Sequence, residues 1–357
     1  MKNLSWFINL CVMLLLVGCD NEESSSVLFS EYKTQLPANV WLVQNHSSDE
    51  KLYLQDMDSK KVYSVSFDVG NRIAIDTNDF TIKGYAFQFC VIGTDSIIYL
   101  PSDEYSSIQL LSFNGIAYDE FRPTYGIPTI TPNEKLAYHK YNLYFPNAND
   151  TYGVFNQSER KQYYLNTSPV FQLNIENKSQ QLWGDFPYSY THEATNFSNF
   201  FPTICPFDDD CILSYQRDHS ILLFKNQKLE KSVLCKSKYI KSFLPYPDDK
   251  VFDMKYYQNY LFSQPKYSDL IYNHHTKKFY RIAIHEKAIT SNGKLVDNTN
   301  PTWSIIVMDK NLNIEKEELF FYRQFDPSII YPTKGGLLVK KAATNNEDKL
   351  ILAKINL

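Results

Sequence analysis

Short apolar stretches recur along most of the chain, each followed by a polar turn and a second stretch in which alternate positions are apolar. A period of two is typical of β-hairpins, because successive side chains of a strand point to opposite faces of its sheet. The turns are rich in Asn, Asp and Lys, which suits tight connections. The pattern predicts hairpins at residues 51–67, 107–121, 170–186, 220–234 and 303–319.

A further short strand precedes most of these hairpins. Such strands are predicted at residues 95–101, 141–147, 211–217 and 277–284. Near the C-terminus, residues 335–341 precede a strand at 349–356 that has no partner strand downstream. We therefore expect its partner to come from the N-terminus, from residues 27–32 or 40–44.

The spacing of the hairpins is irregular but close to the length of one propeller blade. Five internal hairpins and one blade shared between the two ends of the chain predict an all-β, six-bladed β-propeller. Pairing of the N- and C-terminal strands would close the ring, and seven blades are the next possibility. A pair of β-sandwiches is the other alternative, but it gives no reason for one theme to recur around the chain.

The N-terminal residues follow a different pattern. An apolar stretch of about a dozen residues runs from Trp6 to Val17, too short for a membrane-spanning helix, which needs roughly 20. The four residues that end at Cys19, LVGC, resemble the lipobox of bacterial lipoproteins. The resemblance implies cleavage after Gly18 and acylation of Cys19, so that a lipid anchors the protein to a membrane. An ordinary secretory signal is the alternative.

The acidic and serine-rich run after Cys19 is too polar to fold by itself. We therefore divide the chain into a signal peptide at 1–18, a tether at 19–36 and a single propeller domain at 37–357. The acidic run also resembles the export signal of surface lipoproteins in Bacteroidota, although a solvated linker would look the same. The expected location is the cell envelope, as an outer-membrane lipoprotein that could reach the cell surface.

The lipobox and the six-fold theme occur together with three short segments, at residues 280–281 (YR), 307–309 (VMD) and 335–339 (GGLLV). Together these features resemble an uncharacterised lipoprotein family of Bacteroidota whose members are similar to TolB-like six-bladed propellers. The resemblance covers nearly the whole mature chain. It implies a fold, but the family has no assigned catalytic residues that could be transferred.

Composition limits the classes of partner. The net charge of −4 provides no basic surface for nucleic acid, so none is expected as a partner. The 27 Tyr and 24 Phe residues favour strands.

Four cysteines follow the lipobox, and none forms the C-x-x-C spacing of a zinc site. Cys205 and Cys211 bracket a short acidic loop and could form a disulfide in an oxidising compartment. The alternative is that Cys90, Cys205, Cys211 and Cys235 are buried thiols that act as small apolar side chains.

Other candidate sites are weak. His192 starts the sequence HEATN, which lacks the second histidine of a zinc-protease helix. The acidic run at 208–210 lacks the spacing of an EF-hand loop, and His274 and His275 are neighbours in a polar turn. The chain contains neither a P-loop nor a G-x-S-x-G elbow. We expect no metal and no cofactor, and we assign no catalytic residue.

Residues 184–202 form the most informative loop, because a long connection rich in aromatic residues is typical of a functional segment. Aromatic rings beside amide and hydroxyl groups suit sugars or peptides. The alternative is that these rings pack between two blades. The candidate binding residues are Tyr188, Tyr190, His192, Phe197 and Phe200.

Two functions are compatible with this sequence. The first is a membrane-anchored binding or scaffold module for a protein or glycan partner. The second is a carbohydrate-active hydrolase or lyase with its site at the central channel of the propeller. The fold hosts both, so the side chains at the channel mouth should discriminate. Converging charged groups would favour an enzyme, whereas an apolar channel with an aromatic rim would favour binding.

Overall fold

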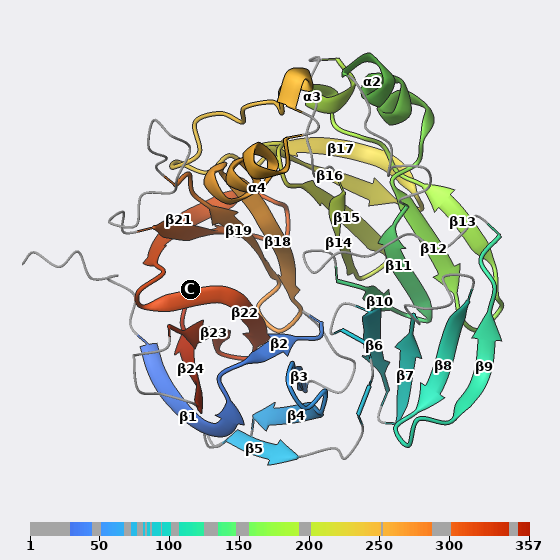
Figure 1. Ribbon diagram of the computed structural model, residues 1–357, viewed down its shortest axis with the longest axis vertical. Coiled ribbons are helices and arrows are strands. Elements are labelled where there is room, and N and C mark those ends of the chain that lie inside the picture. Colours follow the sequence, from blue (N-terminus) through green and yellow to red (C-terminus); the bar gives the residue numbers. More distant parts are fainter. Residues whose placement is uncertain are drawn as a thin grey trace, which may run out of the picture.

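The apolar runs of the sequence become strands that form six four-stranded antiparallel sheets in the computed structural model. The sheets stand around a common axis as the blades of a six-bladed β-propeller, which confirms the predicted fold class (Figure 1). The structure describes residues 29–44, 51–67, 73–76, 81–82, 84–85, 88–93, 95–100, 107–124, 135–147, 157–192, 201–250, 253–287, 301–342 and 349–357.

Each blade runs from an innermost strand at the axis to an outermost strand at the rim (Figure 1). Blade 1 consists of β2 (Val40–Leu42), β3 (Leu52–Asp56), β4 (Val62–Phe67) and β5 (Ile73–Asp76). Blade 2 consists of β6 (Phe89–Ile92), β7 (Ser96–Tyr99), β8 (Ile108–Ser112) and β9 (Ala117–Phe121). Blade 3 consists of β10 (Ala137–His139), β11 (Asn142–Pro146), β12 (Val170–Asn174) and β13 (Gln180–Trp183).

The second half of the ring repeats this order and ends on a composite blade. Blade 4 consists of β14 (Pro202–Phe207), β15 (Asp210–Tyr215), β16 (Ser220–Lys225) and β17 (Lys228–Leu234). Blade 5 consists of β18 (Lys266–Asn273), β19 (Lys278–Ile284), β20 (Thr302–Met308) and β21 (Ile314–Phe321). Blade 6 consists of β22 (Phe325–Thr333), β23 (Gly336–Lys341), β24 (Lys349–Ile355) and β1 (Phe29–Pro37). Four of the five predicted hairpins are the outer two strands of blades 2 to 5, whereas the hairpin at 51–67 forms the two middle strands of blade 1, with β5 as a further outer strand.

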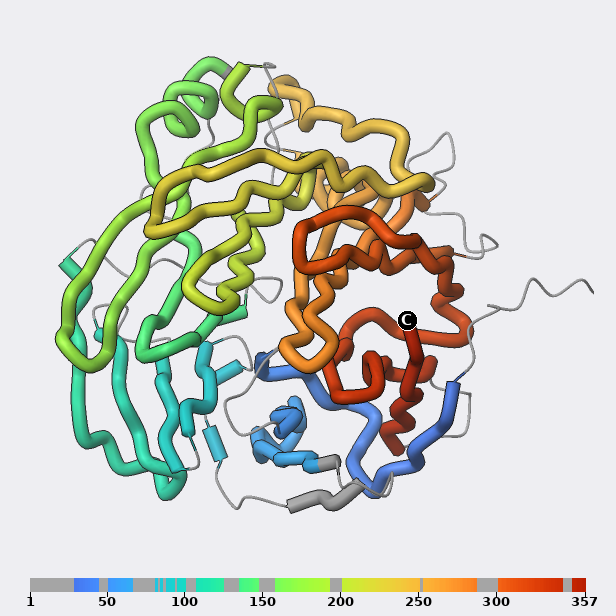
Figure 2. Tube along the Cα trace, turned by 180° about the vertical axis from the view of Figure 1, so that it is seen from behind, coloured from blue at the N-terminus to red at the C-terminus, as the bar shows by residue number. Residues whose placement is uncertain are grey.

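The ring closes through antiparallel pairing of β1 with β24, in which Phe29 faces Ile355 and Tyr32 faces Leu352. Seen from behind, the blue strand β1 and the red strand β24 lie side by side (Figure 2). Of the two N-terminal segments predicted as the closing strand, the first therefore fills this role, and residues 40–42 form β2 instead. The propeller also includes residues 29–36, which the sequence places in the tether, because β1 is the outermost strand of blade 6 and its Thr34 and Leu36 are buried.

The hydrophobic core consists of six clusters, one at each contact between neighbouring blades. Because a middle strand packs on both sides, its residues are buried almost without interruption, as in β15 and β20. The outermost strand β17 is mostly exposed. Burying each large aliphatic side chain contributes about 1.5–3 kcal/mol, so the blade contacts supply most of the stability of the ring.

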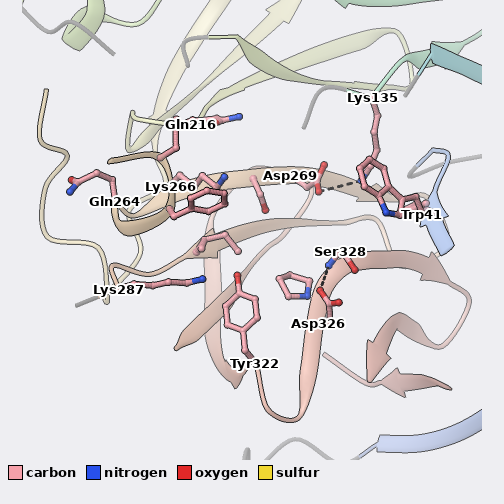
Figure 3. A pocket seen from close by; sticks show the side chains of 16 residues that line it. Trp41, Lys135, Gln216, Gln264, Lys266, Asp269, Lys287, Tyr322, Asp326 and Ser328 are labelled. Atoms are coloured by element: carbon pink, nitrogen blue, oxygen red, sulfur yellow. Dashed lines mark hydrogen bonds and ion pairs between the residues drawn. The ribbon is translucent and has the colours of Figure 1, made fainter. Parts of the chain in front are cut away.

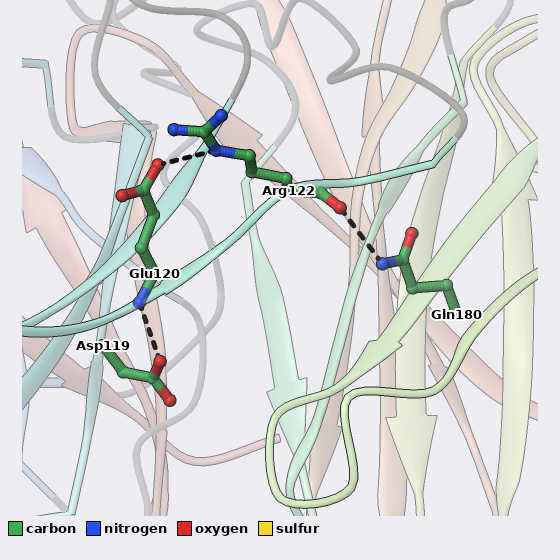
Figure 4. A network of polar contacts seen from close by, with 4 residues as sticks. All are labelled: Asp119, Glu120, Arg122 and Gln180. Carbon is green, nitrogen blue, oxygen red and sulfur yellow. Dashed lines mark hydrogen bonds and ion pairs between the residues drawn. The ribbon is translucent and has the colours of Figure 1, made fainter.

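The rim of the ring carries polar contacts instead. On β9, the carboxylate of Glu120 lies 3.4 Å from Arg122 Nε, and Asp119 accepts from the backbone N–H of Glu120. The side chain of Gln180 on β13 donates to the carbonyl oxygen of Arg122, which links blades 2 and 3 (Figure 4). Exposed pairs of this kind contribute about 0–1 kcal/mol, so they are secondary to the core.

Helices occupy connections between strands, and the sequence pattern does not predict them. Among the described residues they are α2 (Gln157–Asn166), α3 (Tyr188–Thr191), the 3-10 turn η2 (Asp248–Lys250) and α4 (Met254–Ser263). Asp253 caps α4 by accepting from the backbone N–H of Tyr256 at 2.9 Å. None of the helices in the described ranges combines the length and the apolar character needed to cross a bilayer.

The disulfide considered between Cys205 and Cys211 is absent, since both are free, buried thiols. Cys205 faces Ile212 across the β14–β15 pair, so it points to the opposite side of the sheet from Cys211. Cys211 packs against blade 3 and Cys205 against blade 5. All four described cysteines are buried, in agreement with the alternative.

Candidate functional site

A pocket opens at the axis of the propeller, where the innermost strands β2, β18 and β22 meet beside α4 (Figures 1 and 3). Its cavity volume is about 360 Å³, which lies in the range of small-molecule sites. Blades 1, 5 and 6 provide most of its wall, and connections next to blades 3 and 4 provide the rest. The pocket therefore lies at the centre of the ring, in the position where the mouth of a propeller's central channel is expected.

Aromatic side chains stand at the edge of this pocket. Trp41 on β2 is 38% exposed, and Phe262 at the end of α4 is 63% exposed. Tyr322, in the turn between β21 and β22, is partly buried. Burial raises the pKa of the Tyr322 phenol above its ordinary value, so its hydroxyl stays protonated and can donate a hydrogen bond. The edge thus offers two ring surfaces and one hydroxyl.

The acidic groups of the pocket are neutralised by lysines. Asp269 on β18 lies 3.4 Å from the Nζ atom of Lys135, and both side chains are largely buried. Asp326 on β22 lies 3.5 Å from Lys340 Nζ and accepts from the backbone N–H of Ser328 at 2.9 Å. These carboxylates are therefore held by ion pairs and by a backbone hydrogen bond, and they stabilise the pocket wall.

Two further lysines face the pocket from its other side. Burial lowers the pKa of Lys266, the first residue of β18, to about 8, and the positive charges of Arg217 and Lys287 act in the same direction. Lys287 Nζ lies 5.1 Å from the ring centroid of Tyr322. Arg217 is buried behind this wall, where it donates to the carbonyl oxygen of Pro265 and stacks on Tyr260. Positive charge therefore accumulates here.

The channel mouth combines the features expected of both functions, since charged groups converge on it and aromatic side chains surround them. Sequence reasoning misses this site entirely. Its side chains come from segments as far apart as residues 41, 135, 216, 266 and 326, and none of these segments carries a short motif. Only the circular arrangement of the blades brings them together.

The loop at 184–202 is divided by the structure. Tyr190 is completely buried and packs against Tyr164, Phe186 and Tyr215 between blades 3 and 4. For this residue the prediction of a binding role is wrong, and the packing alternative holds. Tyr188 is 68% exposed.

Of the candidate binding residues in this loop that the structure describes, only Tyr188 and His192 are exposed. Tyr188 stacks on the exposed ring of His192, with the centroids 4.1 Å apart. Residues two apart on a helix point about 200° from each other, which explains why the single turn of α3 separates Tyr188 from Tyr190. Phe197 and Phe200 lie outside the described residues.

We expect the two tyrosines of α3 to respond very differently to truncation. Tyr190→Ala should lower the free energy of unfolding by about 3–5 kcal/mol, as for other buried rings. Tyr188→Ala should change it by less than about 0.5 kcal/mol, because the ring is exposed. Urea denaturation of both variants measures the difference. Equal losses would contradict the division of this loop into a core half and a surface half.

The remaining candidates do not assemble into a metal site. Asp208 and Asp209 are exposed, and Asp209 pairs with Lys140 at 2.7 Å. The rings of His274 and His275 lie side by side in their turn. Within the described part of the chain, no group of three or more His, Cys, Asp or Glu side chains could hold a metal ion.

A cluster in blade 5 brings together a serine, a histidine and a glutamate that the sequence does not single out. Ser304 Oγ lies 2.9 Å from His285 Nε2 and donates to Glu317 at 2.6 Å. The order differs from that of a nucleophilic triad, in which the carboxylate orients the histidine. Ser304 is also completely buried, and burial lowers the pKa of His285 to about 4. The cluster holds the sheet together.

No family model matches this chain, and no curated protein matches it. Among solved structures, the chain is similar to a member of the DUF4221 family from Bacteroides vulgatus, with 12% identity and a TM-score of 0.65 over 93% of this chain and 99% of that one. This likeness confirms the propeller fold implied by the family resemblance. At this identity it shows the fold alone.

Two enzymes give weaker matches. A virginiamycin B lyase from Staphylococcus aureus has 10% identity and a TM-score of 0.43 over 92% of this chain and 99% of that one. A protein of Carbohydrate-Active Enzymes Family AA12 from Trichoderma reesei has 9% identity and a TM-score of 0.48 over 93% and 97%. Both scores are too low to support an argument about function.

Proposed function

We propose that this protein is a binding module of the cell envelope, anchored by lipid at Cys19, whose central pocket binds part of a glycan. The observation that supports this most is the combination of Trp41 and Phe262 at the edge of a pocket lined by charged and amide side chains. Sugars present apolar faces that stack on aromatic rings, and hydroxyl groups that pair with charged and amide groups. A protein partner would reach the same pocket through a side chain or a terminus.

The pocket proposal predicts a specific loss of binding. Full-length protein in detergent should capture a subset of glycans on an array, and the double variant Trp41→Ala, Phe262→Ala should weaken capture about tenfold or more. Tyr118→Ala is the matched control, because Tyr118 is an exposed aromatic residue on the rim of blade 2. If the double variant captured glycans as well as the wild type, the pocket would not be the binding site.

The anchor makes a separate prediction, since Cys19 lies outside the described residues. Cys19→Ser should abolish incorporation of a fatty-acid analogue and release the protein from the membrane fraction, because stable attachment requires more than one acyl chain. Metabolic labelling followed by fractionation measures both effects. Continued labelling of the variant would contradict the lipobox interpretation.

A further inference from the structure

The two sides of the central pocket differ in charge balance. On one side Asp269 and Asp326 each have a lysine within ion-pair distance, so this wall is close to neutral. On the other side stand Lys266 and Lys287, and no carboxylate of the described residues lies within 4.0 Å of either ammonium group. Figure 3 shows these two lysines and Tyr322 across the pocket from Trp41.

This concentration of positive charge is costly without an occupant. Lys266 is desolvated, and the buried Arg217 and Lys287 lower its pKa further, whereas Asp269, which already pairs with Lys135, has a smaller opposite effect. Like charges gathered away from water repel each other strongly, because the protein interior screens them poorly. A negatively charged group between the lysines would remove this penalty and would pair with both.

We infer that the Lys266–Lys287 side of the pocket is an anion site, and that it takes the carboxylate of an acidic sugar. This inference rests on the proposed function and adds the chemical class of the ligand. Two separate ammonium groups provide charge without the fixed fork of an arginine, and the Tyr322 hydroxyl can donate a further hydrogen bond. The exposed ring of Trp41 lies opposite, where the sugar ring would stack.

The volume of the cavity restricts the ligand further. About 360 Å³ is at the lower end of the range for ligand pockets. The pocket therefore holds the end of a saccharide chain, with the rest of the chain leaving past Phe262 and α4. An acidic sugar at a terminal position fits this arrangement.

A thermal-shift titration with a matched pair of probes tests the inference. Sodium glucuronate should raise the melting temperature of the full-length protein in a saturable manner at constant ionic strength, since a ligand that binds the native state stabilises it. Glucuronamide differs only in carrying a neutral amide in place of the carboxylate. It should require at least a tenfold higher concentration than glucuronate to give the same shift in melting temperature. The glucuronate shift should also shrink between pH 7 and pH 9 as Lys266 loses its proton, with Arg217, Lys287 and Asp269 as the other charged groups nearby.

Variants separate binding from folding. Lys266→Gln should abolish the glucuronate shift and, in the absence of ligand, raise the melting temperature, because it removes a desolvated charge. A lysine with a purely structural role would not combine a loss of the ligand-induced shift with a gain in the melting temperature of the free protein. Lys228→Gln, at an exposed position of β17, should leave both quantities unchanged.

The other outcomes of the titration and of the glycan array show whether the anion site alone or the glycan binding as a whole is wrong. If glucuronate and glucuronamide stabilise the protein equally, or if neither does while neutral glycans are still captured through Trp41, the anion site is wrong and the proposed glycan binding stands. If neither probe acts and the glycan array is also blank, both proposals fail.

Discussion

A chain that lacks residues 349–357 should fail to form a stable propeller, rather than losing one strand from an otherwise intact ring. Strand β24 pairs with β23 on one side and with β1 on the other, so its removal leaves β1 without a partner. Its buried Leu350, Leu352 and Ile355 belong to the clusters that join blade 6 to blades 1 and 5.

The size of the expected effect follows from burial. Several large aliphatic side chains at about 1.5–3 kcal/mol each amount to much of the 5–15 kcal/mol that stabilises a typical domain. The truncated protein should therefore show no cooperative thermal transition by near-ultraviolet circular dichroism. A chain ending at residue 355 is the control, because it keeps all of β24. A cooperative transition in the longer deletion near the wild-type temperature would contradict closure through this strand.

Arg281→Met should be the most damaging single substitution outside the apolar core, lowering the free energy of unfolding by about 3–5 kcal/mol. The side chain starts on β19 of blade 5, is completely buried, and reaches across to blade 4. Its guanidinium carbon lies 3.4 Å from the ring centroid of Tyr267. All of its nitrogen atoms donate hydrogen bonds, and the acceptors are Ser214 Oγ and the backbone carbonyl oxygens of Tyr215, Asp218, His219, Ser220 and Cys235.

The cost arises because those carbonyl groups would lose a donor while remaining buried, at about 1–3 kcal/mol for each group left unsatisfied. Arg281→Lys should recover little, because an ammonium group has three donors and cannot span the same acceptors. Arg323→Met, at an exposed arginine, is the control and should change stability by less than about 0.5 kcal/mol. Chemical denaturation gives the values, and a loss below about 1 kcal/mol for Arg281→Met would contradict this account.

The architecture can be predicted from the sequence because each blade repeats a local pattern of apolar and polar residues. The hairpin at 303–319 shows apolar alternation around a polar turn, and the strand at 349–356 lacks a downstream partner. These features suffice for six blades and for their closure. The helices are missed for a physical reason. Helix α4 is rich in tyrosine and is held by contacts between Tyr246 and Tyr260 rather than by an apolar stripe.

The candidate sites are much harder to predict from the sequence than the architecture is. Tyr188 and Tyr190 look equivalent in the sequence, and only the single turn of α3 decides which one is buried. Lys266 looks like an ordinary strand residue, because its unusual environment depends on Arg217 and Lys287, which approach it through tertiary packing. Distances across a ring of blades cannot be derived from spacing along the chain.

The central claim is that the channel mouth is the binding site, and a crystal structure of the full-length protein grown with an acidic oligosaccharide tests it most directly. We predict a terminal sugar in the pocket, with its carboxylate between Lys266 and Lys287 and its ring against Trp41. A saccharide bound instead at the exposed Tyr188–His192 pair, with the central pocket empty, would contradict the account.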